Sequence, residues 1–391
     1  MKKIIIILTI LCINLFGAEY TLGDKKINLD TFSKENYLYV NVKNLSFWGL
    51  NSKTVGSKIT LKNSKVTMTF SEKFVKVNNE VYSLSNAIIK NNNNFYVDMN
   101  FILEVLNYWL SGNRILKAND YSFPITEGTA TVNKKALRIV STAPGITEKL
   151  YMIGASDKQI ARTDFCDYPA SALKLPSIGT MFSPNTEKIL SLKPDLIIAE
   201  THFNEKVLNK LKDAKVEVFA INSPNSFDDM FRLIKKLGFI TDRVYESRAL
   251  AASLKNKINR TKYILKDIKD KPNVYYAVGA GKGEYTAGRD TFLSELIKTS
   301  GAQNIGDNIT GWTFSLEKLI EANPKIIFGS KAAINTITTS TSYKSLSAVK
   351  NRNYFVIDEN VFNLAGPRLI NEGLKILVSK FYPNKVKELG F

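Results

Sequence analysis

Two stretches of the sequence, 130 residues apart, are near copies of one another, and this repeat constrains the fold more than any other feature. Residues 183–200 read SPNTEKILSLKPDLIIAE, and residues 313–330 read TFSLEKLIEANPKIIFGS. Glu187 aligns with Glu317, and Pro194 aligns with Pro324. Each copy joins a short amphipathic helix to a buried strand through a turn that holds the proline. The repeat therefore predicts two similar α/β lobes in one chain.

The rest of the chain after Leu137 fits two such lobes. Apolar strands alternate there with amphipathic helices, which is typical of a parallel sheet with helices on both faces. Residues 242–270 contain no Gly or Pro and have the period of one long helix. We expect lobe one at 137–241, this helix between the lobes, and lobe two at 271–391. Because ligands of open α/β sheets bind beyond the carboxyl ends of the strands, two facing lobes predict a cleft.

The first 136 residues have a different pattern. Residues 1–18 combine two lysines, a short apolar run and a final Gly-Ala, which predicts a signal peptide and an exported, periplasmic or envelope protein. A lipid anchor on Cys12 is not expected, because Leu11 before it is too large. Residues 19–125 alternate short strands with YVNVKNLSFWGL and YVDMNFILEVLNYWL, each a strand followed by a helix, which predicts a small α+β domain. Residues 126–136 are predicted to be a linker.

Composition disfavours several classes of function. The net charge of +18 is compatible with nucleic-acid binding, but the lysines are spread along the chain without a dense basic run between aromatic residues. After removal of the signal peptide only Cys166 remains, and it is expected to be a small buried residue. His202 is the single histidine, so neither a bare Zn²⁺ or Mn²⁺ site nor a catalytic triad is expected. We predict no enzyme activity, no metal site and no cofactor.

The two-lobe region resembles a known family. The stretches RIVSTAPGITEKLYMIGA, TFLSELIKTSGAQNIG and AGPRLINEGL are similar to the substrate-binding proteins of ABC importers for cobalamin, iron–siderophore and haem. The resemblance implies two Rossmann-like lobes joined by a single rigid helix, with the ligand between them. It also implies an ABC permease dimer and its ATPase as partners, so that contact with the membrane is through the permease alone.

The resemblance gives Glu187 and Glu317 a role. In this family an acidic side chain on each lobe docks onto arginines of the permease, and these two residues fall on the matching positions. The alternative is that both are solvated glutamates in a first helical turn, where the helix dipole favours them.

The region 19–125 resembles the copper amine oxidase N-terminal-like domain, a small module attached to exported bacterial proteins. No cluster of His, Cys or Met suits copper here. We expect a spacer or an interaction surface, and an envelope adhesion or organising protein is the alternative function.

The expected ligand is a large, flat metal chelate or corrinoid that carries cobalt or iron. Aromatic walls and a few cationic groups suit such a ligand. The candidate ligand-binding residues, all in loops after predicted strands, are Arg162, Tyr168, Phe182, His202, Tyr285, Arg289, Trp312 and Arg368. The motif CDYP at 166–169 favours cobalamin, whereas Tyr168, Tyr285 or His202 would suit haem and the arginines a siderophore. The sequence leaves these three classes open.

Overall fold

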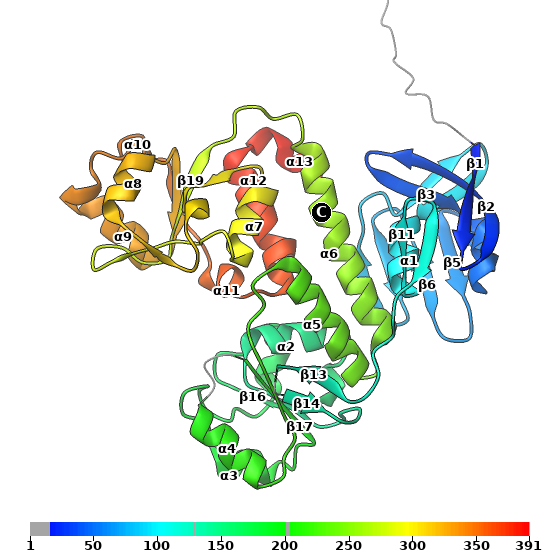
Figure 1. Ribbon diagram of the computed structural model, residues 1–391, viewed down its shortest axis with the longest axis horizontal. Coiled ribbons are helices and arrows are strands. Elements are labelled where there is room, and N and C mark those ends of the chain that lie inside the picture. Colours follow the sequence, from blue (N-terminus) through cyan, green and yellow to red (C-terminus); the bar gives the residue numbers. More distant parts are fainter. Residues whose placement is uncertain (1–15, 129, 201–203, 391) are drawn as a thin grey trace, which may run out of the picture.

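The computed structural model describes residues 16–128, 130–200 and 204–390 (Figure 1). Lobe one is built on a four-stranded sheet with the order β16-β15-β17-β18, and every pairing in it is parallel. These strands are Gln159–Arg162, Ile139–Ser141, Leu196–Glu200 and Val218–Ile221. They read as nearly unbroken apolar runs, which is the pattern of a parallel sheet covered on both faces.

Lobe two repeats this design. Its sheet has the order β21-β19-β23-β24, again all parallel. The strands are Gln303–Asn304, Asn273–Ala277, Ile326–Gly329 and Tyr354–Val356. A small antiparallel pair, β20 (Glu284–Tyr285) and β22 (Thr313–Phe314), is added beside it. In both sheets the strand that comes first in the chain lies between the second and the third, so the two lobes share one topology.

The repeated sequence occupies the same place in both lobes. In lobe one, α3 (Thr186–Ser191) leads into β17, and in lobe two, α8 (Leu316–Ala322) leads into β23. Lys193 and Asn323 end these helices with left-handed backbone, at φ 48° and 39°. The proline that follows each of them cannot continue a helix. The prediction of an α/β fold with two similar lobes is therefore confirmed.

One long helix, α6 (Val244–Ile264), connects the lobes. It is shorter than the predicted range, because Leu265 ends it and the chain then turns toward β19. It packs along α5 of lobe one and near α7 and α13 of lobe two. The remaining helices of the two-lobe region are α2 (Pro144–Met152), α4 (Glu205–Asp213), α5 (Phe227–Ile240), α7 (Phe292–Thr299), α9 (Lys331–Thr339), α10 (Ser347–Lys350), α11 (Glu359–Phe362), α12 (Leu374–Phe381) and α13 (Val386–Leu389).

The N-terminal domain combines two antiparallel-rich sheets with one α-helix. The larger sheet has the order β11-β12-β1-β2-β3-β10-β9 and the smaller one β4-β5-β6-β7-β8. The strands run, from β1 to β12, over Phe16–Leu22, Lys25–Lys34, Tyr37–Asn41, Asn51–Val55, Lys58–Lys62, Thr67–Phe70, Phe74–Val77, Glu80–Ser83, Ile88–Asn91, Asn94–Asp98, Tyr108–Ser111 and Arg114–Lys117. A 3₁₀ helix at Val42–Trp48 and the helix α1 at Met99–Val105 follow β3 and β10, as the internal repeat indicates.

One element of this domain differs from the sequence pattern. The run MNFILEVLNYWL was predicted to be helical throughout, but α1 ends at Val105 and Tyr108–Ser111 form β11. Asn107 adopts a left-handed backbone at φ 68° between them. Pairing of β11 with β12 overrides the helical spacing of the apolar residues.

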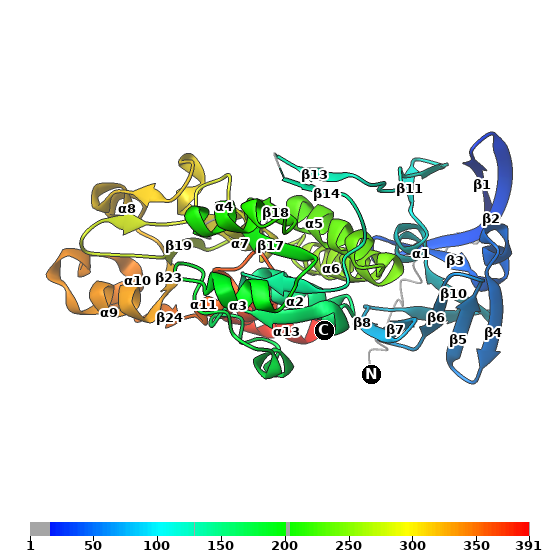
Figure 2. The same ribbon diagram turned by 90° about the horizontal axis from the view of Figure 1, so that it is seen from below.

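The N-terminal domain packs against α6, and the contact is polar. The Asn256 side chain donates to Asp98 Oδ2 at 3.1 Å and accepts from the Ser85 backbone N–H at 3.0 Å. Ser253 Oγ donates to the Ser83 carbonyl at 2.6 Å. Figure 2 shows this domain at one end of the elongated molecule, with α8 and α9 of lobe two at the other. The domain is thus fixed to the helix between the lobes by buried hydrogen bonds.

The segment before lobe one is ordered. A hairpin of β13 (Ile125–Glu127) and β14 (Ala130–Val132) packs beside β18, and Asn133 N donates to Glu217 Oε1 at 2.7 Å. This hairpin occupies part of the predicted linker and belongs, by its contacts, to the surface of lobe one. Among the described residues, no helix is long and apolar enough to cross a membrane.

Candidate functional site at the strand ends and the lobe junction

The candidate residues of lobe one lie in the loops that follow its strands. Arg162 ends β16 and donates from Nη1 to the Thr163 carbonyl at 2.9 Å, while its Nε is buried without a partner. Phe182 is 63% exposed, and Asn204 Nδ2 holds its carbonyl at 2.9 Å. These two candidate residues of lobe one are therefore an exposed aromatic ring and a guanidinium that mainly braces its own loop. The prediction for His202 lies outside the described residues.

Cys166 lies in the same loop region and has the expected character of a small buried residue. It is fully buried, and its Sγ lies 3.2 Å from Thr163 Oγ1. Burial raises the pKa of its thiol, so the neutral thiol predominates.

The candidate residues of lobe two come together on the small β20–β22 pair. Tyr285 pairs with Thr313, and Thr286 N donates to the Trp312 carbonyl at 2.8 Å. The rings of Tyr285 and Trp312 are 45% and 39% exposed. Arg289 is exposed close by in the chain, where its backbone N–H bonds the Ile309 carbonyl at 3.0 Å. The lobe thus presents two aromatic rings and one cation on neighbouring segments.

Arg368 has a different environment, because it lies where the two lobes meet. It follows α11 in lobe two and is only 9% exposed. Its guanidinium donates to Glu372 at 3.0 and 3.2 Å and lies 3.6 Å from Glu148 Oε1 of α2 in lobe one. Its Cζ stands 4.0 Å from the centre of the Tyr168 ring, also of lobe one. Arg368 and Tyr168 are therefore joined across the junction, and carboxylates already compensate the Arg368 charge.

Glu148 is the residue of this junction that the sequence did not single out. It is buried, and its Oε2 atom has no hydrogen-bond partner among the described residues. Lobe two covers it closely, since a Cβ on Gly366 would lie 2.9 Å from that oxygen and the Glu148 carboxyl would have to shift to make room. Burial raises the pKa of Glu148 to about 7, although Lys149 and Arg368 oppose the shift. No local motif marked Glu148, because its partner Arg368 lies far away in the sequence.

The neighbouring Lys149 is also fully buried. Its ammonium donates to the Gly145 carbonyl at 3.1 Å within α2. Burial lowers the pKa of Lys149, while the carboxylates of Glu200 and Glu148 act in the opposite direction. The second half of α2 thus holds one buried carboxyl and one buried amine side by side in the chain.

The two candidate docking residues occupy equivalent positions on the two lobes. Glu187 lies in the first turn of α3, which Asn185 caps by accepting from Lys188 N at 2.9 Å. Glu317 lies in the first turn of α8, where Ser315 Oγ accepts from Lys318 N at 3.2 Å. Both glutamates are exposed. Hydrogen bonds from its own backbone N–H and from Ser315 lower the pKa of Glu317, which keeps it ionised.

Within the described ranges, no group of three or more His, Cys, Asp or Glu side chains is placed to hold a metal ion. Among the candidate residues, the two lobes present exposed aromatic rings, the exposed Arg289 and a closed polar junction. Such surfaces suit non-covalent binding of a large organic ligand.

Known proteins match the two-lobe region. Residues 139–361 match the family described as periplasmic binding protein. The uncharacterized ABC transporter substrate-binding lipoprotein YvrC of Bacillus subtilis is 30% identical over 282 residues, with 68% of this chain and 88% of the relative covered. The vitamin B12-binding protein of Yersinia pseudotuberculosis is 26% identical over 242 residues, with 60% of this chain and 83% of the relative covered.

The fold agrees with these relatives. The crystal structure of a possible iron-binding, periplasmic solute-binding protein from Staphylococcus epidermidis is 30% identical and superimposes with a TM-score of 0.58. The match covers 64% of this chain and 100% of that structure, which leaves the N-terminal domain largely outside it. The chain therefore belongs to the periplasmic binding protein family, whose members bind substrates for ABC transport and are not enzymes.

Proposed function

We propose that this protein is the substrate-binding component of an ABC importer and captures a cobalamin or an iron chelate, either a siderophore or haem. One structural observation supports this ligand class in addition to membership of the family. Phe182 lies between β16 and α3 of lobe one, Tyr285 lies in β20 and Trp312 just before β22 of lobe two, and all three residues are exposed. Burial of apolar ring surface is favourable, and a flat macrocycle or chelate packed on these residues would cover it.

The cationic group that accompanies these rings is Arg289. Unlike Arg368, it makes no ion pair with any described carboxylate, so it is free to contact propionates, a phosphate or siderophore oxygens. We propose that Arg289 supplies the charge of the binding site. Arg368 and Tyr168 would contact the ligand at the lobe junction, where the two side chains already pack against one another. His202 stays a proposed contact of the ligand.

A spectral titration tests the choice of ligand. The purified protein is titrated separately with cobalamin, haemin and a ferric siderophore, and a saturable shift with one of them is expected. The variant Trp312→Ala should weaken that binding about five- to thirtyfold, since loss of one aromatic contact costs roughly 1–2 kcal/mol. Absence of a saturable shift with all three compounds would refute the proposed ligand class.

We further propose that Glu187 and Glu317 dock this protein onto its permease. Each lies exposed at the start of an equivalent helix, one on each lobe, where two arginine pockets of a permease dimer can each accept a carboxylate. The double variant Glu187→Ala with Glu317→Ala should abolish uptake in cells while ligand affinity stays within about twofold of wild type. Variants of the nearby exposed Lys188 and Lys318 serve as matched controls. Undiminished uptake by the double variant would exclude the docking role.

The proposed location of the protein follows from its relatives and from the predicted signal peptide. Relatives are periplasmic or lipoprotein substrate-binding proteins. We propose that residues 1–18 direct export and that the mature protein acts outside the inner membrane, in contact with the membrane through its permease.

A further inference from the structure

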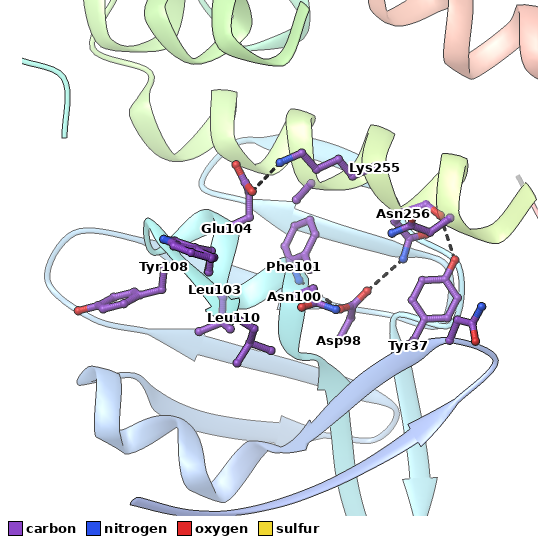
Figure 3. Close-up of a pocket in the computed structure, with 14 residues that line it drawn as sticks. Tyr37, Asp98, Asn100, Phe101, Leu103, Glu104, Tyr108, Leu110, Lys255 and Asn256 are labelled. Atoms are coloured by element: carbon purple, nitrogen blue, oxygen red, sulfur yellow. Dashed lines mark hydrogen bonds and ion pairs between the residues drawn. The ribbon is translucent and has the colours of Figure 1, made fainter. Parts of the chain in front are cut away.

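A cavity of about 350 Å³ lies in the seam between the N-terminal domain and α6 (Figure 3). Its walls come from α1, from β11, from the residues just before β3, and from the middle of α6. Domain seams are frequent places for small-molecule sites, and this volume lies within the usual range of roughly 300–1,000 Å³. None of the residues assigned above to transport lines it.

One wall of the cavity is rigid and polar. Tyr37 donates its hydroxyl to the Asn256 carbonyl at 2.9 Å, and Asn256 donates to Asp98. All three side chains are buried, and Figure 3 shows them facing the cavity from both sides of the seam. Asp98 Oδ1 also accepts the backbone N–H of Phe101 at 3.1 Å. This wall is held in place before any ligand arrives, which lowers the cost of binding.

The charges that line the cavity are compensated. Lys255 donates to Glu104 Oε2 at 2.9 Å, and Lys235 donates to the other oxygen at 3.1 Å. Burial raises the pKa of Asp98 to about 6, and hydrogen bonds from neighbouring groups limit the shift. Glu104 and Lys255 therefore neutralise one another, and the buried Asp98, which has no ion pair among the described residues, is held by hydrogen bonds from Asn256 and the Phe101 N–H. The cavity suits an uncharged ligand.

The mouth of the cavity carries polar groups of another kind. The side-chain amides of Asn36, Asn100 and Asn259 are exposed and form no hydrogen bond with any other described residue. Each amide offers both donors and an acceptor. Trp109, which is 50% exposed, and the half-buried Tyr108 line the same cavity. A cavity lined both by free amides and by an open aromatic ring matches a ligand that has hydroxyl groups on its edge and an apolar face.

We propose that this cavity binds a neutral sugar ring, and that the N-terminal domain thereby holds the transport protein to a glycan. The amides bond the ring hydroxyls, and the Trp109 indole packs on the C–H face of the pyranose. The Tyr37, Asp98 and Asn256 wall forms the floor. The ligand chemistry is the same for a free oligosaccharide and for a glycan of the cell envelope, and the test below separates these two sources.

An extended peptide is the competing occupant. β11 is the last strand of its sheet, so its free edge can in principle pair with another chain. Backbone pairing does not need three free side-chain amides around one cavity, nor an aromatic ring beside them. The observations therefore favour the sugar, and a peptide is an outcome that the experiment can detect.

The test uses the full chain with two matched tryptophan variants. Wild type, Trp109→Ala and Trp312→Ala are titrated with chitotriose and maltotriose by calorimetry, and each is sedimented with purified peptidoglycan sacculi. Saturable binding of an oligosaccharide, or of sacculi alone, is expected for wild type and distinguishes a free sugar from an envelope glycan. Trp109→Ala should weaken it about tenfold or more, and Asn259→Ala about fivefold, whereas Trp312→Ala should leave it unchanged within about twofold.

The same variants separate this proposal from the transport function. Trp312→Ala should impair binding of the metal chelate or corrinoid, and Trp109→Ala should not. The sugar site is overturned if wild type shows no saturable binding to either oligosaccharide or to sacculi. Equal binding by wild type, Trp109→Ala and Asn259→Ala would also overturn it. So would competition by a sugar-free stem peptide but not by oligosaccharides, because that result would assign the site to a peptide.

Discussion

The buried carboxyl of Glu148 should make the stability of this protein fall as the pH rises. Burial at the lobe junction raises the pKa of Glu148 from its ordinary value of 4.5 to about 7. Between these two pH values the folded chain binds more protons at this site than the unfolded chain does. The free energy of unfolding therefore decreases with increasing pH across this window. The contribution of Glu148 is fully present below pH 4.5 and is lost as the pH rises through 7.

The size of the effect follows from the shift. Each pKa unit corresponds to about 1.4 kcal/mol, so the ionised Glu148 destabilises the folded state by roughly 3 kcal/mol relative to the neutral form. The substitution Glu148→Gln keeps the shape and removes the titration. Relative to wild type, the free energy of unfolding of Glu148→Gln should thus rise by roughly 3 kcal/mol between pH 4.5 and pH 8.

Urea unfolding of both proteins at several pH values, followed by circular dichroism, measures this difference. Glu372→Gln is the matched control, because it removes a carboxylate from the same Arg368 guanidinium but from a side chain that is 42% exposed. Its effect should vary much less with pH. A Glu148→Gln effect that stays constant within about 0.5 kcal/mol from pH 4.5 to 8 would refute the reasoning, since it would show that the folded protein hydrates Glu148.

Three further predictions concern the domain seam and the lobes. Asn256→Ala should lower the free energy of unfolding by about 2–3 kcal/mol in urea denaturation, because it leaves the buried Asp98 short of a donor, whereas Asn259→Ala should change it by less than about 0.5 kcal/mol. Burial raises the pKa of Glu104, but Lys255 and Lys235 outweigh it and hold that pKa below its ordinary value. Glu104 therefore contributes stability that is present above pH 4.5 and is lost as the pH falls through its lower folded-state pKa, and Glu104→Gln should cost about 2 kcal/mol at pH 7 in the same assay and progressively less as the pH falls below 4.5. Small-angle scattering should show only a small contraction on ligand binding, because α6 restricts the lobes to small hinge motions, and a large contraction would contradict this.

The two-lobe fold was predictable because its signals are local. The E-K-x-[IL] helix, the turn and the proline occur in each lobe within 18 residues, and period and turn chemistry are enough to place them before a buried strand. The equivalent positions of Glu187 and Glu317 follow directly from that repeat. What such patterns cannot reveal is which surface of one element meets which surface of another.

Three features show this limit. Residues Tyr108–Ser111 look helical by spacing but form a strand, because a partner strand is available to them. Glu148 sits in an ordinary helical run, and only the fold brings it to Arg368. The sequence of α6 gives no sign that the polar Asn256 is buried, because the N-terminal domain that covers it is distant in the chain. The ligand contacts of the aromatic residues and arginines stay predictions.

The polar seam on α6 has a consequence for how such a chain can be divided. Cutting away residues 19–125 would bare a strip of the helix, including Ala252, Ser253 and Asn256, that has adapted to being covered. In the shorter protein these buried residues would be exposed to solvent, and the free energy of unfolding would decrease. Substitutions on this strip of α6 and on the facing residues of the N-terminal domain should therefore be coupled. The N-terminal domain and the two-lobe region are then expected to evolve together.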